Sequence, residues 1–261
     1  MFDSGFGGLT VARALIDLLP AEHLVYLGDT GRYPYGPRPQ AEVRGFARQI
    51  IEYLVQQHGV KLVIVACNTA AATGLAELQE DVDVPLIGVI EPGVRALALA
   101  TQSGRVGVIG TAGTVASGAY QDAVATLAGD LELTSAACPG LVEFVERGDT
   151  QSDEVARLAE RLLAPLREAR VDALLLGCTH YPFLARVLSD VMGRDVVLVS
   201  SADETAFEVR RRLEGTALAR LPSSGPGHHR WFSSGDVAWF QELGRTLLGP
   251  ELAEVHPVTW D

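Results

Sequence analysis

Short apolar runs alternate with amphipathic segments along most of the chain. The runs predicted to be strands cover residues 24–27, 61–65, 86–90, 105–109, 173–176 and 196–199. Between them, apolar residues recur at helical spacing, and the predicted helices include residues 41–58, 154–169 and 205–213. Such alternation is typical of parallel sheets with helices on both faces. The pattern therefore predicts an α/β protein in which helix exceeds strand.

The chain also contains an internal repeat. Residues 60–69 can be laid over residues 171–180, because each segment runs from a valine through apolar residues to a cysteine. A Gly-rich turn lies 64 residues before Cys67, counted from Asp3, and 67 residues before Cys178, counted from Thr111. The repeat predicts two similar α/β domains with mostly parallel central sheets, related by a pseudo-twofold axis.

Composition narrows the class of protein. The formal net charge is −12, which disfavours nucleic acid as a partner, since a phosphate-binding surface needs positive charge. No apolar run approaches the ~20 residues that span a bilayer, and no signal peptide is recognisable. Three cysteines without a secretory signal favour reduced thiols. We expect a cytoplasmic protein that has no membrane partner; self-association into a homodimer stays open.

Two of the three cysteines are candidates for chemistry. Cys67 and Cys178 each end a predicted strand, and ligands of α/β sheets bind at the carboxyl ends of strands. Each is followed by residues that suit a helix start, whose dipole would favour the thiolate. A buried cysteine is often only a small apolar residue, but matching positions in both halves favour a functional pair. Cys138 has no such counterpart and is predicted to be structural.

Paired thiols could form a redox disulfide, bind a metal or exchange protons with a substrate. The two cysteines lie 111 residues apart in sequence, unlike a Cys-x-x-Cys redox motif, and the histidines are too scattered for a zinc site. Proton exchange suits thiols, whose ordinary pKa of ~8.5 lies near working pH. The single lysine, Lys61, starts the strand that Cys67 ends, about 20 Å away at ~3.3 Å per residue. A pyridoxal cofactor is therefore not expected, nor is a metal or any other cofactor.

Several motifs together resemble one known family. They are Asp-Ser-Gly-x-Gly-Gly-Leu-Thr at residues 3–10, Gly-Asp-Thr at 28–30 with Pro-Tyr-Gly at 34–36, Ala-Cys-Asn-Thr at 66–69, Glu-Pro-Gly at 91–93 and Gly-Cys-Thr-His-Tyr-Pro at 177–182. In this order they resemble glutamate racemase, and residues 200–206 and 233–237 extend the resemblance over nearly the whole chain.

The resemblance implies a reaction and a set of site residues. It implies interconversion of L- and D-glutamate without pyridoxal phosphate, supplying D-glutamate for bacterial peptidoglycan. Cys67 would take the α-proton from D-glutamate and Cys178 from L-glutamate, assisted by Asp3 and His180 respectively. Glu146 matches a further acidic position, although it could equally be a solvated helix residue. The substrate would be held by Asp3, Ser4, Tyr35, Gly36, Asn68, Thr69, Thr111, Thr114, Thr179 and His180.

The resemblance also implies a division into two domains, and two alternative functions stay open. The first α/β domain would comprise residues 1–92 and 206–261 and the second residues 93–205, with the active site in the cleft between them. One rival is a racemase acting on aspartate. Another is a two-lobed binding protein without catalysis, in which Cys67→Ala would leave ligand binding intact.

Overall fold

Two parallel β-sheets, each with its own helices, organise the chain in the computed structural model, which describes residues 1–260. Unit 1 comprises Met1–Val89 together with the residues from Ala202 onward, and unit 2 comprises Ile90–Ser201. Unit 1 is therefore discontinuous in sequence, and unit 2 is inserted into it.

The sheet of unit 1 has six strands in the order β10-β9-β2-β1-β3-β4, and all of its pairings are parallel. The strands are β1 (Phe2–Asp3), β2 (Leu24–Gly28), β3 (Val63–Val65), β4 (Leu86–Gly88), β9 (His229–Ser233) and β10 (Val255–Pro257). Apart from the edge strand β10, where His256 and Pro257 are exposed, the central residues of these strands are buried and apolar, as expected where helices cover both faces of a parallel sheet.

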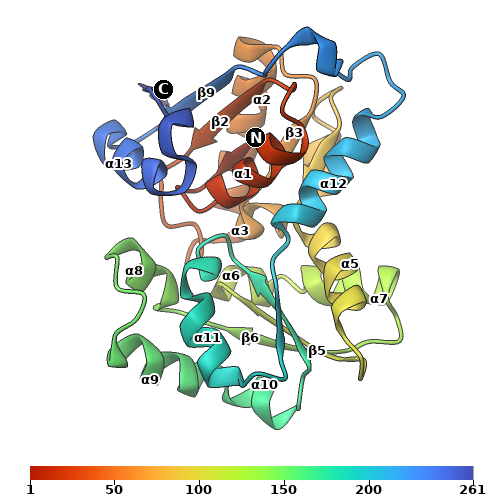
Figure 1. The fold of residues 1–261 in the computed structure, drawn as a ribbon, viewed down its shortest axis with the longest axis vertical. Helices are drawn as coiled ribbons and strands as arrows, with labels where there is room; N and C mark the ends of the chain where they lie inside the picture. The colour runs from red at the N-terminus through yellow and green to blue at the C-terminus, as the bar shows by residue number, and fades with distance from the viewer. Residues whose placement is uncertain (261) are drawn as a thin grey trace. The chain divides into compact units, whose positions relative to one another are not determined.

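The helices of unit 1 come from both ends of the chain. They are α1 (Leu9–Leu18), α2 (Gln40–His58), α3 (Asn68–Ala71), α4 (Leu75–Gln79), α12 (Ala202–Leu213) and α13 (Val237–Leu248), with short 3₁₀ turns at Pro222–Ser224 and Gly249–Glu251. Helix α1 packs against α12 and α13, so the red and blue ends of the chain lie side by side (Figure 1). Helix α2 packs against α3, α4 and β2.

The sheet of unit 2 has four parallel strands in the order β6-β5-β7-β8. These strands are β5 (Arg105–Gly110), β6 (Glu132–Ala137), β7 (Ala173–Gly177) and β8 (Val197–Val199). The helices are α5 (Ile90–Ala100), α6 (Ala112–Ala116), α7 (Ala119–Leu127), α8 (Leu141–Glu146), α9 (Asp153–Leu162), α10 (Ala164–Glu168) and α11 (Ala185–Met192), with a 3₁₀ turn, η1, at Tyr181–Leu184.

The two sheets share one strand order. In unit 1 the order β2-β1-β3-β4 corresponds strand by strand to β6-β5-β7-β8 in unit 2. The predicted fold class, two α/β sets with parallel sheets, is confirmed. In each unit the chain leaves its first strand (β1 or β5) for the neighbour on one side and later adds the neighbour on the other side, which makes a topological switch point. Ligands of such sheets bind at the carboxyl ends of the strands beside this point.

Some predicted boundaries differ from the structure. The boundary expected between residues 92 and 93 lies inside α5, because proline is tolerated in the first turn of a helix, where its missing N–H costs nothing. The helix predicted over residues 154–169 is two helices, α9 and α10. They are divided at Leu163, and Pro165 lies in the first turn of α10. The strand predicted over residues 86–90 ends at Gly88.

The membrane prediction can also be compared with the helices. Among the residues that the structure describes, no helix combines the length and the apolar character that crossing a bilayer requires.

Candidate active site

Both candidate thiols stand directly after corresponding strands. Cys67 comes two residues after β3 and Cys178 one residue after β7, and these strands match in the shared order. The two side chains are 4% and 7% exposed. Each thiol is therefore held at a switch point of its own sheet.

Cys67 lies beside the Gly-rich turn that follows β1. Its thiol donates to the hydroxyl oxygen of Ser4 across 3.6 Å, and Asp3 is wholly buried at the end of β1. A Cβ atom on Gly8 would lie 2.6 Å from the Cβ atom of Asp3, so only glycine allows the turn to fold back this closely. Burial, together with the nearby Asp3 and Cys67, raises the pKa of Tyr26 well above its usual value. The tyrosine thus stays a neutral phenol beneath the thiol.

Cys178 has an imidazole and a carboxylate in line with it. The Nδ1 atom of His180 lies 4.0 Å from the Cys178 sulfur, and the Nε2 atom lies 2.6 Å from Oε1 of Glu146. His180 is 2% exposed, and Glu146 is the last residue of α8. A carboxylate on one ring nitrogen fixes which tautomer faces the sulfur, and it stabilises the imidazolium when a proton arrives. The structure therefore brings Glu146 and His180 together, which the sequence pattern alone left undecided.

The third cysteine has no polar partner of this kind. Cys138 follows β6, is 1% exposed, and its thiol donates to the carbonyl of Ala136 at 3.8 Å. Burial, aided by the nearby Cys178, raises the pKa of the Cys138 thiol to about 12. A thiol of that pKa stays protonated at neutral pH, which agrees with the structural role expected for it.

A helix begins directly after Cys67 and a 3₁₀ turn begins shortly after Cys178, as predicted, but both are short. Cys67 is itself the N-cap residue of α3, which has only four residues, and its side chain makes no capping hydrogen bond. Cys178 is followed by a turn and the four-residue η1, which starts with Tyr181 and Pro182. Helices this short carry little aligned dipole. The polar neighbours of each thiol, rather than a helix, set its environment.

The substrate-binding candidates of unit 1 fall into two groups. Ser4, Asn68 and Thr69 are buried around Cys67. Tyr35 and Gly36 lie in the loop after β2, where the Tyr35 phenol turns inward and donates to the Asp29 carboxylate. Burial and the Asp29 charge raise the pKa of this phenol well above its usual value. The Tyr35 hydroxyl is therefore engaged with Asp29.

The candidates of unit 2 lie at the ends of β5 and β7. Thr111 caps α6, since its hydroxyl oxygen accepts from the Thr114 N–H at 3.2 Å and lies 3.0 Å from the Thr114 hydroxyl. Thr114 is wholly buried, and Thr179 is 7% exposed directly after Cys178. These hydroxyls and the N–H groups near them are hydrogen-bonding partners suited to a carboxylate.

Sequence reasoning missed one polar centre. Asp29, part of the Gly-Asp-Thr motif at residues 28–30, is wholly buried after β2, and its carboxylate accepts from four side chains. The donors are the Tyr35 hydroxyl, Arg32 Nε at 2.7 Å, Ser234 Oγ at 2.6 Å and Trp260 Nε1 at 2.8 Å. In the sequence, the only sign that Asp29 is a buried polar centre is its position after a strand and beside a Gly-containing turn. Asp29 fixes the 33–36 loop to the C-terminal part of unit 1.

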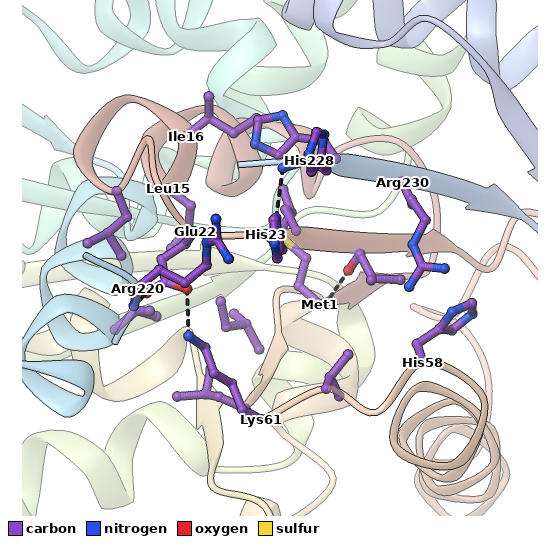
Figure 2. A pocket seen from close by; sticks show the side chains of 18 of the residues that line it. Met1, Leu15, Ile16, Glu22, His23, His58, Lys61, Arg220, His228 and Arg230 are labelled. Carbon is purple, nitrogen blue, oxygen red and sulfur yellow. Dashed lines mark hydrogen bonds and ion pairs between the residues drawn. The ribbon is translucent and has the colours of Figure 1, made fainter. Parts of the chain in front are cut away.

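A cavity of about 510 Å³ opens at the opposite edge of the same sheet. Its lining includes the amino ends of β2 and β9 and four of the six histidines of the chain (Figure 2). Within it, Lys61 donates to the Glu22 carboxylate at 2.6 Å, and the rings of His23 and His228 stack 5.3 Å apart. Because Cys67 lies at the carboxyl end of the sheet, this cavity is not the candidate active site.

Comparison with known proteins agrees with this geometry. Residues 8–208 match the family model described as Asp/Glu/Hydantoin racemase. A glutamate racemase of Parafrankia sp. is 53% identical over 98% of this chain and 92% of its own length. The chain belongs to the glutamate racemase family. This racemase is therefore an isomerase, and the family predicted from its motifs is confirmed.

Solved structures of relatives share its fold. The glutamate racemase of Bacillus anthracis superposes with a TM-score of 0.91 at 41% identity, covering 100% of this racemase and 96% of that chain. The glutamate racemase of Francisella tularensis, solved in complex with D-glutamate, gives a TM-score of 0.90 at 31% identity, covering 99% and 96%.

Proposed function

We propose that this racemase interconverts L- and D-glutamate by moving the α-proton between two thiols, Cys67 and Cys178. One observation carries the proposal: buried thiols stand after corresponding strands of two sheets with the same strand order. One thiolate removes the α-proton, and the other thiol donates its proton to the opposite face of the carbanion. Atoms and charge balance within the pair, since each turnover converts one thiol to a thiolate and the reverse.

Glutamate is favoured as the substrate by the relatives. The Parafrankia protein is 53% identical over nearly the whole chain, and the Francisella structure contains D-glutamate. The product D-glutamate is consumed in the building of bacterial peptidoglycan, and we assign the enzyme to that supply. We assign the enzyme to the cytoplasm, because its three cysteines form no disulfide, as is usual in a reducing compartment.

The first half-reaction uses the neighbours of Cys67. In this proposal Cys67 takes the proton of D-glutamate, and Asp3 stabilises the protonated substrate ammonium and the emerging thiol. Ser4, at 3.6 Å from the Cys67 sulfur, orients it. Asn68, Thr69 and the backbone of Tyr35 and Gly36 bind the substrate carboxylates.

The second half-reaction uses the line from Cys178 through His180 to Glu146. Here Cys178 takes the proton of L-glutamate, and His180 assists it through Nδ1, held in its tautomer by Glu146 at 2.6 Å. Thr111, Thr114 and Thr179 bind substrate oxygens. This line resembles other arrangements in which a carboxylate orients a histidine that activates a nucleophile or base.

No organic cofactor has a part in this proposal. A pyridoxal site needs a lysine for the Schiff base. The single lysine of the chain, Lys61, lies at the amino edge of the sheet, where its ammonium donates to Glu22 and to the carbonyl of Leu218. The thiols and their neighbours are therefore assigned the whole proton transfer.

The test is α-proton exchange in heavy water. The enzyme is incubated with D- or L-glutamate, with aspartate as control and no added pyridoxal phosphate. We expect deuterium at the α-carbon and inversion of glutamate only. Inversion of aspartate at an equal rate would instead favour the aspartate rival.

Cysteine variants separate catalysis from simple binding. Cys67→Ala and Cys178→Ala should each abolish racemisation, by at least 10³-fold, because loss of a proton-transfer group costs about that much. Cys138→Ala should retain activity within a factor of about three. If wild type does not turn over glutamate and Cys67→Ala still binds it, the protein is a binding protein without catalysis.

A further inference from the structure

A buried tyrosine fixes the turn beside Cys67. Tyr26 lies in the middle of β2 and is wholly buried, and its hydroxyl donates to the Gly5 carbonyl at 2.9 Å. The phenol is packed closely against the turn, because a Cβ atom on Gly8 would lie 2.8 Å from its oxygen. The hydrogen bond joins the middle of β2 to the turn that follows β1, its neighbour in the sheet.

The carbonyl that Tyr26 holds belongs to the residue after Ser4. Gly5 directly follows Asp3 and Ser4, and the Ser4 hydroxyl lies 3.6 Å from the Cys67 sulfur. A shift of the Gly5 peptide would therefore move both polar neighbours of this thiol. Displacements well below 1 Å change proton-transfer rates, because reaction requires the groups to be aligned.

A second buried tyrosine fixes the turn that carries Cys178. Tyr181 is the first residue of η1 and is wholly buried. Its hydroxyl donates to the Cys138 carbonyl at 3.2 Å, and its backbone N–H donates to the Cys178 carbonyl at 3.1 Å. The turn holding Cys178 and His180 is thereby attached to the residue that follows β6, two strands away from β7 in the sheet.

A purely structural explanation exists for both hydroxyls. Buried phenols almost always find an acceptor, and losing one partner leaves a buried carbonyl unsatisfied wherever it lies. Tyr26 and Tyr181 differ from other buried tyrosines in where their hydrogen bonds lie. Each holds the turn of one thiol only, at the carboxyl edge of one sheet, and neither lies in the turn of the other thiol.

We propose that Tyr26 and Tyr181 are positioning residues for the two half-reactions, Tyr26 for the Cys67 thiol and Tyr181 for the Cys178 thiol. This inference rests on the proposed two-thiol racemisation of glutamate. Neither tyrosine exchanges a proton with the substrate. Each acts through the turn that it holds.

The test compares Tyr26→Phe with Tyr181→Phe, and each variant serves as the control for the other. The equilibrium constant of racemisation is one, so kcat/KM must fall by the same factor from both enantiomers in any variant. We expect a fall of about 10-fold, the effect of one lost buried hydrogen bond. The distinction lies in the primary isotope effects measured with α-deuterated D- and L-glutamate.

In Tyr26→Phe the step at Cys67 becomes more rate-limiting. The isotope effect on kcat/KM should rise for D-glutamate, whose deuterium moves to Cys67 first, and should fall for L-glutamate. Tyr181→Phe should give the reverse. Tyr53→Phe, a change in α2 away from both turns, should leave the rate and both isotope effects unchanged.

The results separate this inference from the proposed function. Rates that fall while both isotope effects move together, or that do not fall at all, would overturn the positioning role and leave the cysteine variants as evidence for the reaction. If wild type does not racemise glutamate, both proposals fail. Should a phenylalanine variant not fold, 3-fluorotyrosine at the same position keeps the ring and alters the donor, and its isotope effects give the same test.

Discussion

Cys67 and Cys178 stand at matching strand ends but contact chemically different side chains. The first thiol faces a serine hydroxyl, and the second faces an imidazole that a carboxylate holds. An imidazole can store a proton near neutral pH, whereas a serine hydroxyl cannot. The two half-reactions should therefore respond differently to changes in these neighbours.

Replacing Glu146 by glutamine should weaken the Cys178 half-reaction. The amide can still contact His180 but does not stabilise an imidazolium, so we expect kcat/KM to fall about 10- to 100-fold. The isotope effect with α-deuterated L-glutamate should rise. Glu143→Gln, an exposed change on the same helix, is the matched control and should be silent. An equal change in kcat/KM for both variants would show that Glu146 has no specific role in the site.

Cys138 should make the stability of the protein depend on alkaline pH. Its folded pKa of about 12 exceeds the ordinary value of 9.0, so its contribution is complete below pH 9 and is lost as the pH rises toward 12. In this range one such group lowers the free energy of unfolding by up to about 1.4 kcal/mol per pH unit.

The measurement is chemical denaturation of wild type and Cys138→Ala at pH 7 to 11. Alanine costs about 1 kcal/mol at pH 7, because it removes buried atoms. That difference should shrink, and then reverse, as the pH rises. If the difference in unfolding free energy between the two proteins stays constant from pH 7 to 11, the raised pKa does not belong to the Cys138 thiol.

At the residue scale, candidate site residues could be selected from the sequence where a motif repeats, but not where their partners are distant in the chain. The two cysteines could be selected from the repeat alone. Asp29 could not, because its donors Ser234 and Trp260 lie more than 200 residues away. Tyr26 was equally hidden, since a buried aromatic in a strand usually means only packing.

At the element scale, one carboxylate joins a helix end to a strand start in unit 2. Asp172, just before β7, accepts from the Thr101 hydroxyl and from the N–H groups of Gln102 and Ser103 at 2.8 and 2.6 Å, after the end of α5. Burial opposes its charge, but these hydrogen bonds outweigh burial and hold the pKa of Asp172 at about 2.

Asp172→Asn should destabilise unit 2 without changing catalysis. After allowance for solvent screening we expect a loss of about 1 kcal/mol near neutral pH. The contribution is present above about pH 4 and is lost as the pH falls toward 2, so the difference in Tm between variant and wild type should narrow there. Asp130→Asn, exposed in the same unit, is the control for thermal melts. An unchanged Tm would contradict the role.

Strands and long helices could be predicted well from periodicity, and short elements could not. Predicted residues 24–27 and 173–176 lie within β2 and β7, and α2 begins one residue before its predicted start. The four-residue α3 and η1 show no periodicity, because little more than one turn is too short for a repeating pattern, and only the helix-start residues after each cysteine indicated them. The Glu-Pro-Gly motif at residues 91–93 lies in α5, which packs on β7 and β8, although proline and glycine give no sign of a helix in the sequence.

At the scale of the whole molecule, unit 1 depends on both ends of the chain. Strand β9 pairs along all five residues of β2, and α12 and α13 cover α1. Without residues 202–261, β2 would become an exposed edge and α1 would lose its apolar partners. Unit 2, by contrast, is one continuous segment with its own four-stranded sheet.

These dependencies predict how fragments fold. A fragment of residues 90–201 should show helical circular dichroism and a cooperative melt, because its core is internal. A fragment of residues 1–89 should not, since it lacks the pairing and burial that the C-terminal part supplies. Co-expression of residues 1–89 with 202–261 is the rescue control. A cooperative melt of residues 1–89 alone would refute the dependence.

The shared strand order sets Cys138, after β6, at the place that Asp29 occupies after β2. Two copies of one ancestral half-length chain account for this match most simply. Each half has a sulfur after its third strand, whereas after its second strand one half holds a buried carboxylate and the other a neutral thiol. Under the two-thiol proposal, the surroundings of each sulfur can therefore be adjusted to one enantiomer independently of the other half.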